Sequence, residues 1–211
     1  MRPTSIAVLG KAPIPGFAKT RLLPRLGAAG AARLPERLLE QALRTAVAAG
    51  LGPVTLWCLP DGGHPVFAAL ARDLGVALQP QRGPDLGARM AHAVAAHAVH
   101  GPVLVIGTDC PALGPAHLRA AAAALAGGDA AVLIPAEDGG YVLIGLAASC
   151  PTLFDGVPWG TDRVAAVTRR RLEALGLRWS EPARLWDVDR PKDLDRLAHL
   201  GRVPPETEPT G

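Results

Sequence analysis

Residues 101–111 read Gly-Pro-Val-Leu-Val-Ile-Gly-Thr-Asp-Cys-Pro, and the apolar run 103–106 at their centre decides the fold class. Glycine and proline stand before this run, and Gly107 follows it. A short, continuous apolar run is typical of a strand that is buried on both faces, as in a parallel sheet. Asp109 comes shortly after the run, at the end of the strand where such sheets bind their ligands.

Short apolar runs and longer Ala/Leu/Arg-rich stretches alternate along the rest of the chain. The pattern predicts strands at 5–9, 54–59, 76–79, 103–106, 130–134, 141–146 and 184–188, and helices at 28–49, 64–74, 86–99, 115–125, 162–175 and 191–200. Pro35 predicts a break or a late start in the first helix. The alternation indicates an α/β domain, a three-layer sandwich in which helices cover a mostly parallel sheet.

Length and composition indicate one globular domain. The chain has 211 residues, of which 49% are hydrophobic and 19% charged, which is too apolar for a disordered chain. We expect residues 1–201 to form a single domain. We expect the segment 202–211, which is rich in proline and glutamate, to be a disordered tail.

Charge and hydropathy exclude several classes of function. The net charge is only +3 and aromatic residues make up 4%, so no nucleic-acid binding is implied. No apolar stretch reaches the roughly 18 residues of a membrane helix, and the first residues lack the apolar segment of a signal peptide. We therefore expect a cytoplasmic protein without membrane insertion. The step from His92 to His97 does not suit two zinc ligands on one helix face.

The loop after the first predicted strand is rich in cations. Residues 10–22 read Gly-Lys-Ala-Pro-Ile-Pro-Gly-Phe-Ala-Lys-Thr-Arg-Leu. The glycine spacing excludes a Walker loop, and the two prolines lack the N–H groups that a phosphate nest requires. Lys11, Lys19 and Arg21 suit a diphosphate or triphosphate. The alternative is a solvated cationic loop that merely begins a helix.

Carboxylates follow two of the predicted strands. Asp109 could bind a hard cation such as magnesium that bridges to phosphate oxygens, or it could cap the next helix. Asp187 and Asp189 would point to one side of the last strand, so they would need a counter-cation or one of them would have to be protonated. Asp189 could instead cap the helix that Pro191 opens, and Asp193 would lie in the first turn of that helix.

Two further stretches lie at the expected ligand edge. Asp138-Gly139-Gly140 could let a ligand approach closely, or it could form a hairpin turn. The stretch 81–90 starts a helix after a strand, with Asp85 as a plausible N-cap. Cys110 is a small buried side chain rather than a nucleophile in this interpretation. No nucleophile elbow and no dinucleotide fingerprint occurs, which weighs against a serine hydrolase and a dehydrogenase.

Taken together, and in order along residues 5–200, these motifs resemble a bacterial family of glycosyltransferase-A-like proteins. That family includes arsenosugar-biosynthesis and radical-SAM/selenodomain-associated glycosyltransferases. The matching pieces are Lys11-Ala-Pro-x-Pro-Gly-x-x-Lys19-Thr20-Arg21-Leu22, Asp85-Leu86-Gly87-x-Arg89-Met90, Gly107-Thr108-Asp109-Cys110-Pro111, Glu137-Asp138-Gly139-Gly140-Tyr141, Trp159-Gly160-Thr161 and Asp187-Val188-Asp189. The chain is more distantly similar to the phospholactate and phosphoenolpyruvate guanylyltransferases of the deazaflavin-cofactor pathway.

The resemblance implies a nucleotide-diphospho-sugar transferase fold (GT-A, Rossmann-like) with Mg²⁺ or Mn²⁺ held by Asp109, Asp187 and Asp189. It implies that Asp109, Lys19 and Arg21 are catalytic. The nucleotide would contact Lys11, Pro13, Gly16, Lys19, Thr20, Arg21, Gln81, Gly83, Asp85 and Thr108. The acceptor substrate would contact Asp138, Gly139, Gly140, Trp159, Gly160 and Thr161. Arg190 stands where the family usually has Thr, which could draw Asp189 toward capping.

Three functions remain open at this stage. The family resemblance favours a magnesium-dependent glycosyltransferase that uses a nucleotide-sugar donor and a small-molecule acceptor. The three cations favour a nucleotidyltransferase that moves a nucleoside monophosphate from a triphosphate to a phosphorylated small molecule. The third is a non-catalytic nucleotide-binding domain, because a fold does not fix a function. Asp138 is a candidate general base, because it lies in the loop that we expect to face the acceptor.

Overall fold

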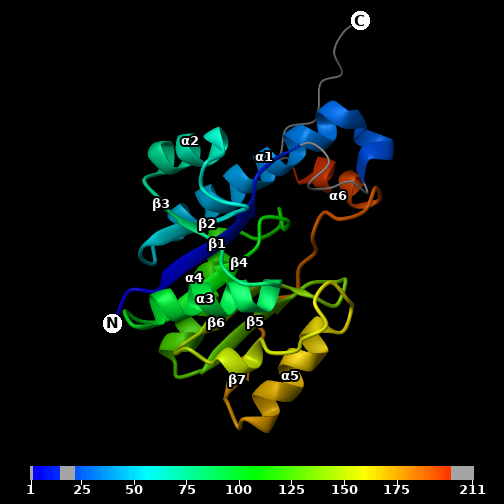
Figure 1. Ribbon diagram of the computed structural model, residues 1–211. Coiled ribbons are helices and arrows are strands. Elements are labelled where there is room, and N and C mark those ends of the chain that lie inside the picture. Colours follow the sequence, from blue (N-terminus) through cyan, green and yellow to red (C-terminus); the bar gives the residue numbers. More distant parts are fainter. Residues whose placement is uncertain (1, 15–21, 201–211) are drawn as a thin grey trace, which may run out of the picture.

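The computed structural model describes residues 2–14 and 22–200 (Figure 1). Its strands are β1 (Ser5–Lys11), β2 (Val54–Leu59), β3 (Ala77–Pro80), β4 (Val103–Ile106), β5 (Ala131–Pro135), β6 (Tyr141–Leu146) and β7 (Trp179–Ser180). Its helices are α1 (Leu23–Ala49), α2 (Pro65–Leu74), α3 (Leu86–Ala98), α4 (Pro115–Ala126), α5 (Val164–Ala174) and α6 (Asp193–His199), with a short 3₁₀ helix η2 (Pro151–Leu153). Gly16, Lys19, Thr20, Arg21 and the segment 202–211 lie outside the described residues.

The strands form one mixed sheet in the order β3-β2-β1-β4-β6-β5-β7. β6 is antiparallel to both of its neighbours, β4 and β5, and every other neighbouring pair is parallel. The predicted α/β class with a mostly parallel sheet is therefore confirmed. Because β1, β4 and β5 run in the same direction, the loops that follow them meet at one edge of the sheet.

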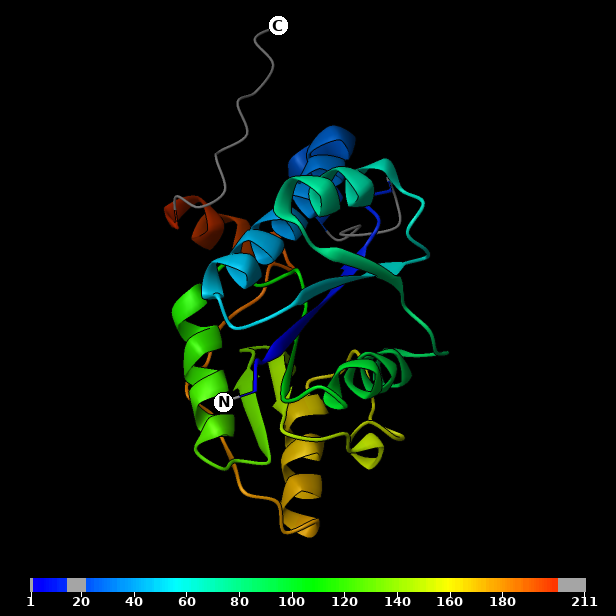
Figure 2. The same cartoon turned by 90° about the vertical axis from the view of Figure 1, so that its left-hand side faces the viewer.

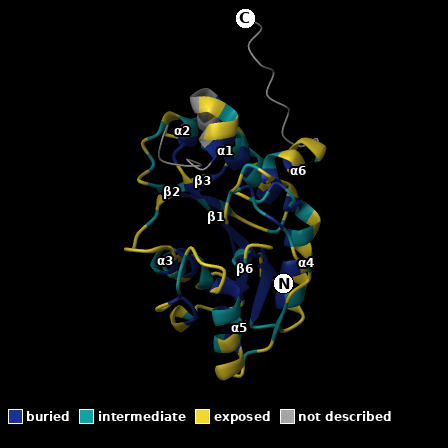
Figure 3. Cartoon of the chain, turned by 90° about the vertical axis from the view of Figure 1, so that its right-hand side faces the viewer, coloured by how far each residue is buried: buried dark blue, intermediate teal, exposed yellow. Residues whose placement is uncertain are grey.

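Helices cover both faces of the sheet, as Figure 2 shows. Side chains of β1 alternate between the two faces, as the two-residue period of a strand requires. Ile6 and Val8 join a buried cluster with residues of α1, α2 and α4. Ala7 joins a second cluster with residues of α3, α5 and η2. The sheet is thus buried between two helical layers whose outer faces are exposed (Figure 3), which confirms the predicted three layers.

The predicted break of the first helix at Pro35 is wrong. α1 continues through Pro35, and its non-helical residue is Gly27, where φ is +64°. Leu34 and Leu38 flank the proline, and both are buried in a third apolar cluster. Burial of this helix face therefore outweighs the backbone hydrogen bond that proline cannot make.

The predicted strand 184–188 is reduced to a single bridge between Leu185 and Ala136. The strand that pairs with β5 is instead β7, which the sequence analysis does not predict. After the bridge the chain leaves the sheet, and the N–H of Val188 donates to the carbonyl of Asp109 at 2.8 Å. The last helix also starts later than expected, at Asp193 rather than at Pro191.

A histidine of α3 should make folding stability depend on pH. His97 packs edge-on against Trp57 with ring centroids 5.9 Å apart, and burial, with His100 nearby, lowers the pKa of His97. A pKa below that of the unfolded chain means that the unfolded state binds more protons. The free energy of unfolding is therefore fully retained above about pH 6.5 and falls as the pH drops below it.

We expect His97→Gln to flatten this decline, by at most about 1.4 kcal/mol per pH unit for one proton. Denaturant unfolding of both proteins at a series of pH values measures the difference. His100→Gln should leave most of the slope, because burial is the larger cause of the shift. Equal slopes in the wild type and in His97→Gln would contradict the assignment.

Candidate functional site

The candidate site lies at the edge of the sheet where β1, β4 and β5 end. Lys11 is the exposed last residue of β1, and the N–H of Ala12 donates to the carbonyl of Leu59 at 2.8 Å. Thr108 and the exposed Asp109 follow β4. These loops are positioned by strands whose own side chains are buried, so the sheet serves as a rigid base for the site.

The structure brings the two carboxylate-bearing segments together. The hydrogen bond from the Val188 N–H to the Asp109 carbonyl joins the loop after β4 to the segment with Asp187 and Asp189. Burial, with smaller effects of the carboxylates of Asp187 and Asp109, raises the pKa of the Cys110 thiol to about 12. Cys110 is half-buried rather than buried, and its thiol stays protonated, as expected for a side chain that is not a nucleophile.

Asp193 holds the turn before α6. Its Oδ2 accepts hydrogen bonds from the backbone N–H groups of Asp189, at 3.1 Å, and Arg190, at 2.7 Å. Asp189 is a predicted cap of this helix, and Arg190 stands where the resembled family has threonine. In the structure the carboxylate of Asp193 accepts hydrogen bonds from both of these N–H groups, so it caps the turn before α6.

The donor set fits a magnesium site that substrate would complete. Magnesium is usually held by one or two protein carboxylates together with waters and substrate phosphates. In the part of the chain that the structure describes, no group of three or more His, Cys, Asp or Glu side chains could hold a metal ion. The predicted ligands Asp109, Asp187 and Asp189 thus do not form a closed site, and phosphate oxygens would have to supply the remaining ligands.

The cationic loop begins and ends at this site. It leaves β1 through Pro13, which is buried, and Ile14, which is exposed. It returns at Leu22, which is fully buried in one apolar cluster with Trp186 and Val188. Lys19 and Arg21 themselves lie outside the described residues, so their contact with a nucleotide stays a prediction.

Three of the residues predicted to contact the nucleotide also make hydrogen bonds or close packing contacts within the fold. The side-chain amide of Gln81 donates to the carbonyls of Gly10, at 3.0 Å, and Trp57, at 2.9 Å. Asp85 caps α3, as predicted, and accepts from the Ala88 N–H at 2.8 Å. At Gly83, where φ is +130°, a Cβ would lie 2.6 Å from the Cβ of Ala88. Their contact with a nucleotide stays a prediction.

The two predicted acceptor stretches lie together. Asp138-Gly139-Gly140 is a hairpin turn between β5 and β6, in which Asp138 Oδ1 accepts from the Gly140 N–H at 2.8 Å. The carbonyl of Gly139 accepts from the Ala165 N–H at 2.9 Å, so the turn packs on the start of α5. Loop 159–161 leads into the same helix, and the Thr161 hydroxyl donates to the Pro158 carbonyl at 2.7 Å.

Loop 159–161 also contacts α3. A Cβ at Gly87 would lie 2.5 Å from Nε1 of Trp159, so the indole rests directly on the helix backbone. The next residue, Gly160, has φ of +79°, and a Cβ there would meet no atom within 4 Å. The structure thereby connects the acceptor stretches to the helix that starts beside the predicted nucleotide contacts.

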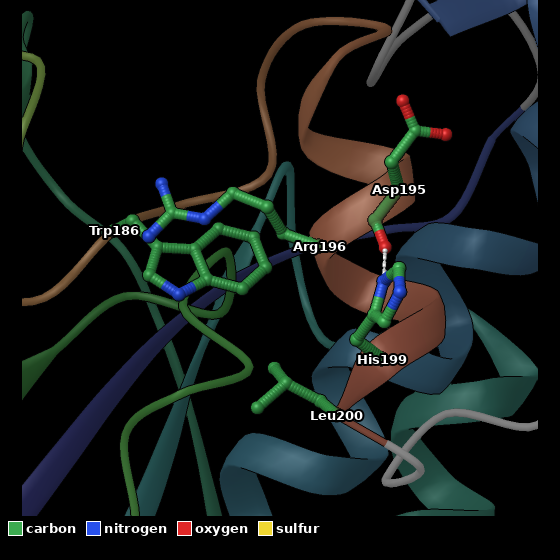
Figure 4. Close-up of a pocket in the computed structure, with 5 residues that line it drawn as sticks. All are labelled: Trp186, Asp195, Arg196, His199 and Leu200. Carbon is green, nitrogen blue, oxygen red and sulfur yellow. Dashed lines mark hydrogen bonds between the residues drawn. The ribbon is translucent and has the colours of Figure 1, made fainter.

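One cluster at the site is missed by sequence reasoning. Arg196 of α6 forms two hydrogen bonds with the carboxylate of Glu137, at 2.7 and 3.0 Å, and its guanidinium lies 4.3 Å from the ring centre of Trp186 (Figure 4). The hydrogen bond with Arg196 lowers the pKa of Glu137. Glu137 and Arg196 are 59 positions apart, so no local spacing could reveal the pair.

Solved structures share this architecture. A proposed nucleotide-diphospho-sugar transferase from Desulfovibrio desulfuricans is 30% identical, with a TM-score of 0.84 over 95% of this chain and 88% of that chain. Glucosyl-3-phosphoglycerate synthase from Mycobacterium tuberculosis, in complex with Mn²⁺, UDP and glucosyl-3-phosphoglycerate, is 13% identical, with a TM-score of 0.57 over 96% and 80%. A cytidylyltransferase from Leptospira borgpetersenii is 12% identical, with a TM-score of 0.60 over 93% and 85%.

These matches confirm the predicted GT-A-like fold. A family model described as "Uncharacterized protein conserved in bacteria (DUF2064)" matches residues 38–161, which is more than half of the chain. No curated protein gives a match. The finer resemblance to arsenosugar-biosynthesis proteins and to guanylyltransferases stays a prediction. Within residues 2–14 and 22–200, no helix is long and apolar enough to cross a membrane.

Proposed function

We propose that this chain, which belongs to the DUF2064 family of bacterial proteins, is a magnesium-dependent transferase that takes a sugar from a nucleotide-sugar donor to a small acceptor. The observation that carries the proposal is the hydrogen bond between Val188 and Asp109. It holds two carboxylate-bearing segments together at the edge of the sheet where the cationic loop begins and ends. The 30% identical structure of a proposed nucleotide-diphospho-sugar transferase supports the same class.

Asp109, together with Asp187 or Asp189, would hold Mg²⁺ or Mn²⁺, and phosphate oxygens of the donor would supply the remaining ligands. When bound, the ion supplies positive charge to the diphosphate that leaves the sugar. Lys11 is exposed at the end of β1. Together with Lys19 and Arg21, it would add further positive charge around the phosphates. Because these charges are already in position, no free energy is spent on rearranging them when the bond to the sugar breaks.

The β5–β6 turn would face the acceptor. Asp138 is exposed, and its hydrogen bond to the Gly140 N–H fixes the orientation of the carboxylate. A carboxylate fixed in this way can accept a proton from the acceptor hydroxyl, which is the role of a general base. The loop with Trp159, Gly160 and Thr161 lies beside this turn and would complete the acceptor side.

Nucleotidyl transfer is the second candidate, and the number of cations favours it. Lys11, Lys19 and Arg21 suit a triphosphate, and proteins with the same fold include a cytidylyltransferase. In that reaction an acceptor phosphate attacks the α-phosphorus, and pyrophosphate leaves. The two candidates use the same carboxylates and differ in the bond that breaks.

A thermal-shift screen of nucleotide sugars and nucleoside triphosphates, with and without Mg²⁺, tests both candidates. A ligand at 100 times its Kd adds about 2.7 kcal/mol to the free energy of unfolding, or roughly 5–10 °C in Tm for a chain of this size. We expect a nucleotide sugar to give this shift only with Mg²⁺. Ligands that give a shift are then tested for turnover. If the protein converts a triphosphate to pyrophosphate and uses no nucleotide sugar, the proposed reaction is nucleotidyl transfer and not glycosyl transfer. A panel without any shift would contradict the nucleotide site itself.

A further inference from the structure

A pocket of about 450 Å³ borders the segment that carries Asp187 and Asp189. It is lined by Trp186, Asp195, Arg196, His199 and Leu200 (Figure 4). Its volume lies within the range of roughly 300–1,000 Å³ that is usual for small-molecule sites. Trp186 directly precedes Asp187, so the pocket is adjacent to the proposed cation site but shares none of its predicted ligands.

The shape of the pocket suits a ring. Figure 4 shows Trp186 with the Arg196 guanidinium on one side, and His199 and Leu200 on the other. The indole of Trp186 is only 8% exposed and packs into the apolar cluster between α1 and α6, so this wall is fixed. The Arg196 guanidinium already lies over the indole ring, so the apolar face of a ligand ring would pack against Leu200 and the small exposed part of the indole.

The charged groups of the wall are already paired. Arg196 forms its two hydrogen bonds with Glu137, and Asp195 forms an ion pair with Arg25 of α1. Burying a further charge among apolar groups is costly unless it finds a partner. The pocket therefore favours an uncharged ligand.

His199 adds a hydrogen-bonding position. Its Nδ1 lies 2.6 Å from the carbonyl oxygen of Asp195, and because a carbonyl only accepts, Nδ1 carries the hydrogen. In the neutral ring Nε2 is then an acceptor. A hydroxyl group on the ligand matches it.

We propose that this pocket binds an uncharged ring that has an apolar face and a hydroxyl group, and that this ring is part of the acceptor. The second clause rests on the proposed function, because Arg196 links the pocket to Glu137 and so to the turn that we place at the acceptor. A sugar ring and a phenol both have this chemistry, and the experiment separates them.

The full-length, isotope-labelled protein is titrated with methyl glucopyranoside, with phenol and with benzoate as the charged control. The reporter is the indole N–H signal of Trp186, which is the signal that Trp186→Phe removes. We expect a saturable shift of this signal with one of the two neutral probes and none with benzoate. His199→Phe, at an exposed position, should weaken that binding about tenfold, which is 1.4 kcal/mol. The matched variant His100→Phe, also at an exposed position, should not weaken it.

Absence of a saturable shift with both neutral probes overturns the proposal, as does equal binding in His199→Phe and the wild type. A shift that occurs only after deletion of residues 201–211 also overturns it, since the chain itself then occupies the pocket. Ring binding in a protein that shows no shift in the nucleotide screen would remove the proposed function and the acceptor clause but leave the pocket assignment. Nucleotide binding without ring binding would remove only the pocket.

Discussion

Asp109→Asn should lower magnesium-dependent turnover by about 1,000-fold. The amide has nearly the shape of the carboxylate but no charge, and a hard cation selects charged oxygen ligands. Asp109 is exposed and Asn keeps its shape, so the free energy of unfolding should change by less than about 1 kcal/mol. Steady-state kinetics at several Mg²⁺ concentrations, together with denaturant unfolding, separate the effect on the site from an effect on the fold.

The matched control is Asp73→Asn. Asp73 is an exposed carboxylate of α2 that pairs with its neighbour Arg72 at 2.9 Å, and it lies on no loop of the site. This variant loses the same charge and should keep full turnover. Asp187→Asn should resemble Asp109→Asn, and the double variant should lose little more, because residues that act together are not additive. Full magnesium-dependent turnover in Asp109→Asn would refute the assignment of this residue.

Local signals in the sequence are enough to predict most of the helices and strands. The bounds of β2, β4 and β6 agree with the predicted runs, since each is apolar and is bounded by glycine, proline or turn residues. Asp85 is correctly predicted as the cap of α3, because capping depends on a residue's own side chain and the next few N–H groups. Such features need no knowledge of the rest of the chain.

Features that depend on distant partners are harder to predict. Trp179 and Ser180 pair with the start of β5, and Leu185 forms only one bridge, with Ala136 just after its end. The amide of Gln81 connects the ends of two strands, a role that no spacing in the sequence reveals. The pair of Glu137 and Arg196 is missed for the same reason. For the site, sequence reasoning therefore predicts residues within motifs but not the contacts that join one motif to another.

Gly139→Ala should lower the free energy of unfolding by about 3 kcal/mol, or roughly 6–12 °C in Tm. Two causes add up. Gly139 has φ of +93°, which L side chains rarely adopt, and a Cβ there would lie 2.6 Å from the carbonyl carbon and Cα of Asp162. These are backbone atoms, so no side chain can rotate away. The turn and the start of α5 must move apart, which also breaks the hydrogen bond from Ala165 to Gly139.

Gly176→Ala separates the two causes. Gly176 also has a left-handed backbone, with φ of +63°, but a Cβ there meets no atom within 4 Å. Gly176→Ala should therefore lower the free energy of unfolding only by the cost of the left-handed backbone, about 1 kcal/mol. If Gly139→Ala costs no more than Gly176→Ala, the close contact between the turn and Asp162 is wrong. If the excess loss appears and turnover falls with it even well below Tm, the contact does more than stabilise the fold. It then sets the distance between the turn with Asp138 and the loop with Trp159, the two stretches that we place around the acceptor.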